Sequence, residues 1–385
     1  MRLKRLLYLL IPPLLYKFLQ KIKKIACQNL NRYRNPNCNN NLSLSIALIG
    51  NGGMGDMLIY INYLTYIRDL VCKETKFDFI SIHDVVSQPV LDIALFNGAD
   101  TVHDSRWYKE NGNELNHDIV LILCRLPFFE RYNREKIAMF APKLLPHFDQ
   151  VFSIGQQYGK DWVLGSDAKV INWTRITGRK RINQFDIGGH LGMSETYRIK
   201  VPIIINEEET LAKFGLSGRR FITICRNASM SYGPENTRLW DLENCKQLVL
   251  LLKAEYKNYL LVQIGTTQND MKELNGVDIS LLDKTTLEEL KVLLKYSALH
   301  IDTDTGNMHL RSALRGGKSV IVFGPTSMEV LGYPENINIS ANVCEPPCEW
   351  VTPDWYVKCA RGDHACMKNI TAEMVIDRIR KEADI

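Results

Sequence analysis

The residues with the clearest potential for chemistry occupy positions 302–310, where the sequence reads Asp-Thr-Asp-Thr-Gly-Asn-Met-His-Leu. An apolar run ends at Ile301 and small residues with helical spacing follow, so we expect a turn between a strand and a helix. The N–H groups and the dipole of a helix N-terminus suit an anion such as a pyrophosphate. Thr305 can add a hydroxyl donor there, and Gly306 lets a phosphate approach the backbone closely.

A second loop of similar composition follows one helix later. The apolar run at 319–323 ends in Gly324-Pro325-Thr326. If the two strands are parallel neighbours, both loops lie at the carboxyl edge of one sheet, where α/β proteins bind ligands. Asp and Thr are also ordinary N-cap residues, and a purely structural turn is the alternative for the first loop taken alone.

A glycine-rich turn at residues 50–56 ends in Asp56. It follows a short apolar run at 45–49 and precedes apolar side chains with helical spacing over 57–71, so strand, turn and helix are expected in that order. Asp56 can be a plain N-cap residue or a carboxylate at the edge of a cleft. The turn also raises a nucleotide-dependent dehydrogenase as an alternative, although it lacks the full G-x-G-x-x-G pattern.

Alternating strands and helices must position these loops. A first block continues with strands at 77–82 and 119–123 and a helix at 90–96, whereas residues 128–200 show little periodicity. A second block begins near residue 220, with strands at 221–225, 259–264, 298–301 and 319–323 and helices at 239–256 and 287–296. Two such blocks predict two parallel-sheet domains joined by a hinge at 200–218, with a final helix at 371–381 that could pack back across the boundary.

Composition and charge narrow the class of protein. Of the 385 residues 45% are hydrophobic and 24% charged, as in a globular chain. The formal net charge is +5, but Asp56 is the first acidic residue and every charged residue before it is Lys or Arg. The rest of the chain carries more acidic than basic side chains, so the charge gives no support for nucleic-acid binding.

The basic charge belongs to a leader at residues 1–43. Its apolar run is broken by Pro12-Pro13 and is shorter than the roughly 20 residues that a spanning helix needs. Residues 17–25 have the pattern of a basic amphipathic helix, so residues 1–30 are expected to lie on an anionic membrane surface. A solvated extension and a cleaved signal peptide are the alternatives.

The three loops together resemble glycosyltransferase family 9, the family of ADP-heptose:lipopolysaccharide heptosyltransferases. The resemblance covers roughly residues 44–380. It depends on motifs whose order and spacing are specific: Gly53-Met54-Gly55-Asp56, Arg238-Leu239-Trp240 in place of Lys-x-Trp, Asp304-Thr305-Gly306-x-x-His309-Leu310, Val322-Phe323-Gly324-Pro325-Thr326 and the ending Cys366-Met367-x-x-Ile370.

The resemblance implies an α/β chain with a GT-B fold, in which two Rossmann-like domains face a cleft. Residues 44–205 would bind the acceptor and residues 206–368 the nucleotide sugar, followed by a C-terminal helix at 369–385. Transfer would invert the sugar without a metal, and Asp56 would be the general base. Gly52, Gly53 and Gly55 would form the loop on the acceptor side.

The resemblance also implies a donor site in the second domain. Arg238 would hold the donor phosphates, and the replacement of Lys by Arg keeps the charge but changes the geometry. Thr305 and Gly306 would bind the pyrophosphate, Asp304 the sugar hydroxyls, and His309 would lie beside the phosphates. For Asp304 a turn-stabilising role and for His309 a packed helix position are the alternatives. Further donor contacts are expected from Arg226, Ser229 and Thr326.

Four late cysteines have the spacing C-x3-C-x10-C-x6-C: Cys344, Cys348, Cys359 and Cys366. Four thiolates can hold a structural Zn or Fe, although paired C-x2-C knuckles are missing. Free or partly disulfide-bonded thiols are the alternative. The other six cysteines are scattered, and we expect them to be reduced thiols of a cytosolic protein.

These inferences predict an inverting glycosyltransferase that moves a sugar, most specifically heptose from ADP-heptose, to a lipopolysaccharide core or related surface glycan. Its expected partners are a nucleotide-sugar donor and an anionic glycolipid acceptor, with no nucleic acid and no cofactor for catalysis. It would be a peripheral enzyme on the cytoplasmic face of a bacterial inner membrane. The alternatives are a protein O-heptosyltransferase of the autotransporter-modifying type and a non-catalytic nucleotide-sugar-binding protein.

Overall fold

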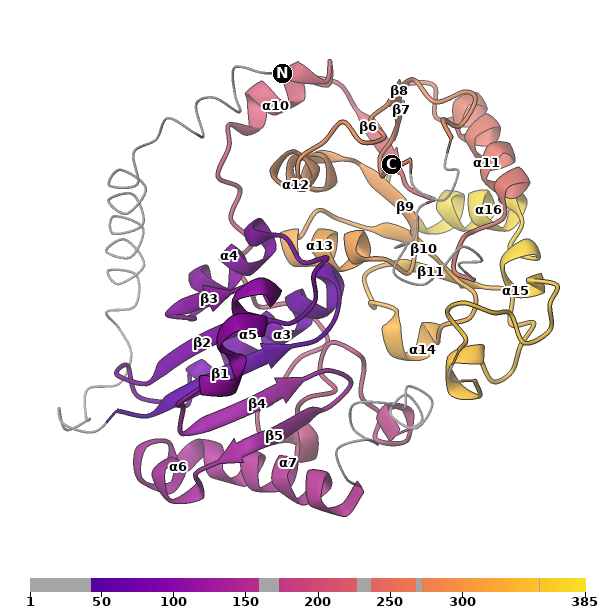
Figure 1. Ribbon diagram of the computed structural model, residues 1–385. Helices are drawn as coiled ribbons and strands as arrows, with labels where there is room; N and C mark the ends of the chain where they lie inside the picture. Colours follow the sequence, from indigo (N-terminus) through magenta and orange to yellow (C-terminus); the bar gives the residue numbers. More distant parts are fainter. Residues whose placement is uncertain (1–42, 159–172, 227–236, 268–271, 353) are drawn as a thin grey trace.

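The computed structural model describes residues 43–158, 173–226, 237–267, 272–352 and 354–385 of the chain. Two sheets form two halves of the molecule, with the first half indigo to magenta and the second orange to yellow in Figure 1. The leader prediction for residues 1–43 falls almost entirely outside the described residues. No helix within the described ranges combines the length and apolar character that crossing a membrane requires.

The first sheet has five strands in the order β3-β2-β1-β4-β5. Its parallel strands are β1 (Ser45–Gly50), β2 (Lys76–Ser81), β3 (Thr101–His103) and β4 (Ile119–Leu123), and β5 (Pro127–Tyr132) runs antiparallel to β4. The helices of this half are α3 (Met54–Arg68), α4 (Gln88–Phe96), α5 (Ser105–Asn111), α6 (Arg134–Phe140) and α7 (Leu145–Tyr158), with short 3-10 turns at η1 (Gly112–Glu114), η2 (Pro142–Leu144) and η3 (Ile187–Gly189).

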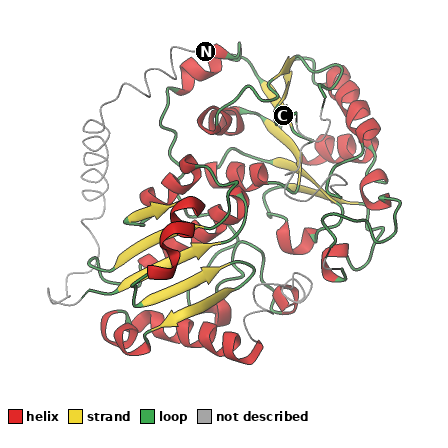
Figure 2. Ribbon diagram, in the orientation of Figure 1, coloured by secondary structure: helices red, strands yellow, loops and turns green. Residues whose placement is uncertain are grey.

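The second sheet has six parallel strands in the order β11-β10-β9-β6-β7-β8. These are β6 (Phe221–Ile224), β7 (Leu260–Gln263), β8 (Ile279–Ser280), β9 (Leu299–Thr303), β10 (Ser319–Phe323) and β11 (Ile337–Ser340). The described helices of this half, red in Figure 2, are α10 (Glu207–Lys213), α11 (Leu242–Glu255), α12 (Leu287–Tyr296), α13 (Gly306–Leu314), α14 (Met328–Leu331), η5 (Cys348–Trp350), α15 (Ala365–Lys368) and α16 (Ala372–Glu382).

Alternation along the strands explains how the helices are layered. In β1, Ile46 and Leu48 face a core shared with α3, α4 and α7, whereas Ala47 and Ile49 face a smaller cluster that α5 covers. On the second sheet one face packs against α11 and α16. The other face, with α12 and α13, belongs to the same core cluster as α3, so the two halves share one continuous apolar interior.

Most predicted elements are present, but three differences bear on the site. Helix α3 begins at Met54 rather than at residue 57, which puts Asp56 inside its first turn instead of in the preceding loop. Strand β9 continues to Thr303, past the predicted end at residue 301. The final helix, α16, packs against α11 and β11 within the second half, so the expectation that it crosses back to the first half is wrong.

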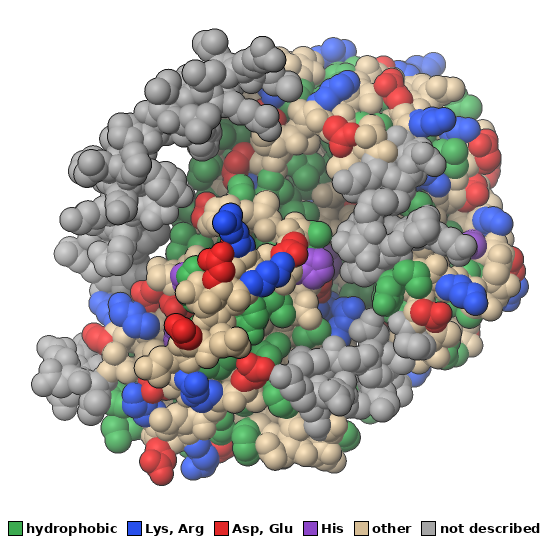
Figure 3. Space-filling model, viewed as in Figure 1, with side chains coloured by type: hydrophobic (Ala, Val, Ile, Leu, Met, Phe, Trp, Pro, Cys, Tyr) green, Lys and Arg blue, Asp and Glu red, His purple; other side chains and the backbone are tan. Residues whose placement is uncertain are grey.

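The surface shows no dominant sign of charge on the face in view. Figure 3 shows Lys and Arg side chains interspersed with Asp and Glu over both halves. Among the scattered cysteines in the described residues, Cys124, Cys225 and Cys245 are free thiols as expected. Cys72 is disulfide-bonded, which contradicts the expectation of a reduced thiol at that position.

Candidate active site

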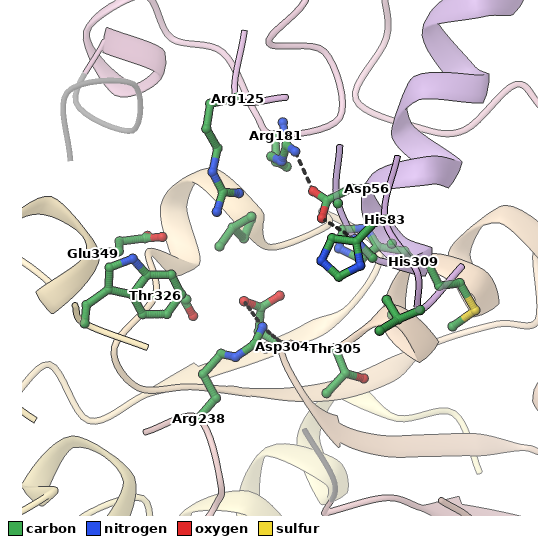
Figure 4. A pocket seen from close by; sticks show the side chains of 18 of the residues that line it. Asp56, His83, Arg125, Arg181, Arg238, Asp304, Thr305, His309, Thr326 and Glu349 are labelled. Carbon is green, nitrogen blue, oxygen red and sulfur yellow. Dashed lines mark hydrogen bonds and ion pairs between the residues drawn. The ribbon is translucent and has the colours of Figure 1, made fainter. Parts of the chain in front are cut away.

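A cavity of about 480 Å³ lies where the carboxyl ends of the two sheets face one another (Figure 4). The first half contributes the β1–α3 turn and loops after β2 and β4, and the second half contributes the loops after β7, β9 and β10. The polar residues that line the cavity are Asp56, His83, Arg125, Arg181, Arg238, Thr266, Asp304, Thr305, His309, Thr326 and Glu349, together with Gly52, Gly53, Gly55 and Gly306. Nearly all the predicted site residues therefore meet in one place.

Asp56 is the third residue of α3 and is held from two sides. Its Oδ2 accepts a hydrogen bond of 3.1 Å from the N–H of Gly53, the N-cap residue of the helix. Its Oδ1 lies 2.5 Å from Nη2 of Arg181. The side chain remains 23% exposed, so the carboxylate is oriented by the helix start and the arginine while one side stays open to the cavity.

The charges around Asp56 determine its protonation. Burial raises the pKa of Asp56, but Arg181 and Arg125 outweigh that effect and hold the pKa below its ordinary value of 3.8. Asp56 is therefore an ionised carboxylate at neutral pH. Arg181 itself is almost fully buried, and its Nη1 has no hydrogen-bond partner among the described residues.

The N-termini of α3 and α13 meet at the cavity. A Cβ added to Gly55 would lie 2.4 Å from Cδ2 of His309, and one added to Gly306 would lie 2.8 Å from Cε of Met54. Two helix N-termini from different halves therefore approach at van der Waals distance because both positions are glycine. Both direct partial positive charge toward the same space, which suits an anionic ligand.

His309 lies in the first turn of α13 and is 7% exposed. Its Nδ1 lies 2.6 Å from the hydroxyl of Tyr333 and 3.2 Å from that of Tyr197. Burial lowers the pKa of His309 below its ordinary value of 6.5, so the ring is neutral at neutral pH. His309 thus combines the predicted position beside the cavity with the packed position that was its alternative.

In the turn between β9 and α13, some polar groups bond within the turn and others face the cavity. Thr305 is the N-cap residue of α13: its Oγ1 accepts from the N–H of Asn307 at 3.3 Å and donates to Asp302 at 2.5 Å. Nη1 of Arg238 donates to the carbonyl of Asp304 at 3.1 Å and lies 4.0 Å from its carboxylate. Figure 4 shows Asp304 and Arg238 facing Asp56 and Arg181 across the cavity.

One predicted donor residue does not join this group, and another cannot be placed. Arg226 does not line the cavity, and its Nε donates instead to the carbonyl of Trp240 at 2.6 Å. Burial lowers the pKa of Arg226, consistent with a position under the surface rather than in the open cavity. Ser229 lies outside the described residues.

Sequence reasoning missed several of the lining residues, and five of them show why. Arg125 comes directly after β4, and the carboxyl-edge rule that found the other loops could have identified it. His83 likewise follows β2 closely. Arg181 lies in the poorly periodic region, and Glu349 and Trp355 lie among the late cysteines, so no local pattern marked these three as parts of the cavity.

The four late cysteines are free thiols in one part of the second half. Burial, together with the neighbouring thiols of Cys344, Cys348 and Cys359, raises the pKa of Cys366 to about 12. Within the described residues, no group of His, Cys, Asp and Glu side chains has an arrangement that could hold a metal ion. The four thiols nevertheless lie near enough to influence one another's pKa, and metal binding at them stays a prediction.

Comparison with known proteins shows which proteins this chain is similar to. Residues 197–354 match the model of glycosyltransferase family 9 (heptosyltransferase). Lipooligosaccharide heptosyltransferase 2 from Campylobacter jejuni is 26% identical over 163 residues, which are 40% of this chain and 49% of that protein. The chain thus spans about half the length of the curated relatives it matches.

Solved structures extend the likeness to nearly the whole fold. The E. coli ADP-heptose lps heptosyltransferase II structure has a TM-score of 0.54 at 16% identity, covering 88% of this chain and 98% of that chain. The iron-containing dodecameric glycosyltransferase TibC from enterotoxigenic E. coli has a TM-score of 0.52 at 14% identity, covering 90% and 81%. The predicted GT-B architecture of two parallel-sheet domains is thereby confirmed.

Proposed function

Because residues 197–354 match the model of glycosyltransferase family 9, we propose that the chain is an inverting, metal-independent glycosyltransferase that uses a nucleotide-sugar donor. The observation that carries the proposal is a single cavity that brings an ionised Asp56 opposite Arg238, Asp304 and the N-terminus of α13. Such a cavity pairs a proton acceptor on one side with a site for a diphosphate on the other.

In the proposed reaction, the carboxylate of Asp56 takes the proton of an acceptor hydroxyl. The acceptor oxygen forms a bond to the anomeric carbon of the donor sugar from the face opposite the leaving group, so the configuration inverts. The bond from that carbon to the diphosphate oxygen breaks, and its electron pair remains on the nucleoside diphosphate. Arg238 and the N–H groups at the start of α13 stabilise that negative charge.

The names of the relatives support the substrates that we propose. The curated Campylobacter relatives are lipooligosaccharide heptosyltransferases, and solved relatives are described with ADP-heptose, so heptose from ADP-heptose and a lipopolysaccharide core or related surface glycan are the proposed pair. An anionic, membrane-tethered acceptor suits the basic leader at residues 1–30 and a peripheral position on the cytoplasmic face of the inner membrane. Transfer to a protein hydroxyl is the alternative acceptor chemistry.

The resemblance to the family also suggests domain boundaries. We propose an acceptor domain at 44–205 and a donor domain at 206–368. Any metal at the late cysteines would be structural and would take no part in the transfer. Element analysis of the purified chain tests this point: a stoichiometric transition metal would support a metal site at the cysteines, and its absence would favour free thiols.

A nucleotide panel tests the proposed function. We expect ADP, among ADP, GDP, UDP, CMP and NAD, to raise the melting temperature of the purified chain by mass action. Arg238→Ala should abolish this shift, whereas Asp56→Asn should preserve it and lower turnover by about 10²–10⁴-fold. A response to NAD alone would favour the dehydrogenase alternative, and full turnover in Asp56→Asn would favour a non-catalytic role for this residue.

A further inference from the structure

The late cysteines belong to a segment that contacts the donor side of the cavity at several points. We call residues 343–370 the cysteine-rich segment. Two of its members, Glu349 and Trp355, line the cavity, although they are far in sequence from the loops after β9 and β10. Their side chains are 3% and 5% exposed, so both are packed into the protein rather than projecting from the surface.

Glu349 forms hydrogen bonds on both sides of Thr326. Its backbone N–H donates to the carbonyl of Pro325 at 3.1 Å. Its carboxylate accepts from the N–H of Ser327. The two neighbours of Thr326 are thus tied to one residue, which leaves the loop after β10 little freedom to move Thr326 in or out of the cavity.

The side-chain hydroxyl of Thr326 is buried without a hydrogen-bond partner among the described residues. Its side chain is 3% exposed, and Oγ1 has no partner among the described residues although it lines the cavity. A buried hydroxyl without a partner is unfavourable, so a native site of this kind usually receives one from a ligand or water. A phosphate oxygen would supply an acceptor at this position.

The same segment contacts the strand-to-helix connection that carries Arg238. The hydroxyl of Thr237, the residue before Arg238, donates to the carbonyl of Trp355 at 2.8 Å. On the far side of Arg238, Nε1 of Trp240 donates to the carbonyl of Ile370, also at 2.8 Å. The segment therefore holds the backbone on both sides of Arg238 as it does on both sides of Thr326.

Close packing adds to these hydrogen bonds. A Cβ added to Gly324 would lie 2.2 Å from Sδ of Met367 and 3.3 Å from Sγ of Cys366. The start of the loop that carries Thr326 is thus in direct contact with the end of the cysteine-rich segment, and only glycine leaves room for it.

We propose that Glu349 is a positioning residue for the donor: it holds Thr326 so that the Thr326 hydroxyl donates to a phosphate oxygen of the bound nucleoside diphosphate, while the cysteine-rich segment braces Arg238 beside it. This inference rests on the proposed function. Glu349 takes no part in bond making or breaking and acts through Thr326.

The test measures the dissociation constant of ADP by calorimetry for the full chain and its variants. Glu349→Ala removes the acceptor for Ser327, and we expect roughly fivefold to tenfold weaker binding, the scale of one hydrogen bond. Glu349→Gln keeps a carbonyl oxygen for that N–H and should stay within about threefold of the wild type. Glu345→Ala is the matched control, because Glu345 is an exposed residue of the same segment.

A double-mutant cycle asks whether Glu349 acts through Thr326. Thr326→Val alone should weaken ADP binding about as much as Glu349→Ala, and the double variant should lose no more than either single variant, since coupled residues are not additive. Additive losses, an unchanged constant in Glu349→Ala, or an equal loss in Glu349→Gln would overturn the positioning role. If the wild type binds no ADP, the proposed donor fails as well, which separates that result from failure of the inference alone.

Discussion

Arg181 governs the proton affinity of Asp56, and this dependence gives a prediction at the scale of one residue. The ion pair at 2.5 Å works against burial, which alone would raise the pKa of Asp56. Arg181→Gln removes the positive charge and leaves the burial, so the pKa of Asp56 should rise. We expect the acid limb of the kcat/KM profile to move toward neutral pH, because the base must be ionised to accept a proton.

The lowered pKa of Asp56 also determines how the stability of the fold depends on pH. A carboxylate with a depressed pKa in the folded state contributes stability that is present above the unfolded pKa of about 4 and is lost as pH falls through the lower folded value. Arg181→Gln should lack this contribution at neutral pH. Arg134→Gln breaks a comparable but exposed pair with Asp149 and is the control. An unshifted acid limb in Arg181→Gln would mean that another group supplies the base.

The contact between α3 and α13 gives a prediction at the scale of secondary-structure elements. Gly55→Ala would place a Cβ 2.4 Å from the ring of His309, and overpacking of this kind costs about 1–3 kcal/mol. Because the contact joins the two halves at the cavity, turnover should fall together with the melting temperature. Gly53→Ala, at the N-cap residue of the same helix, adds a Cβ that meets nothing within 4 Å and should change the melting temperature little.

Periodicity and loop composition predicted the elements that carry their own signal. The strands β1, β4 and β10 consist mostly of apolar residues, and the turns after β1, β9 and β10 lead into the predicted Asp56, Asp304 and Thr326. The antiparallel strand β5 was missed because its outer positions are polar and it lies at an edge. Arg181 was missed because its contact with Asp56 spans 125 positions, and only the fold brings such residues together.

At the scale of the whole molecule, the two halves form one body around the site. A single apolar core runs from β1 and α3 into α13 and β10. Hydrogen bonds cross near the cavity as well: the N–H of Arg181 donates to the carbonyl of Val330 at 2.8 Å, next to the loop that carries Thr326. The residue that orients the proposed base is therefore also tied to the donor half, so binding of a nucleotide and the state of Asp56 are expected to be coupled.

The proposed membrane-binding role of the leader gives a prediction at the scale of the whole molecule. Residues 1–40 can be deleted without removing any residue of the cavity, so the deletion separates location from chemistry. If the acceptor is tethered to an anionic membrane, the deletion should lower kcat/KM on the order of tenfold or more for acceptor in anionic vesicles, because each basic residue near such a surface contributes about 1 kcal/mol of binding. The same enzyme should keep its rate on a soluble acceptor fragment.

Replacing Lys17, Lys21, Lys23 and Lys24 with Gln in the full chain should reproduce the vesicle effect, since the attraction is electrostatic and must also weaken with added salt. Equal rates on vesicles with and without the leader would instead favour a protein hydroxyl as the acceptor.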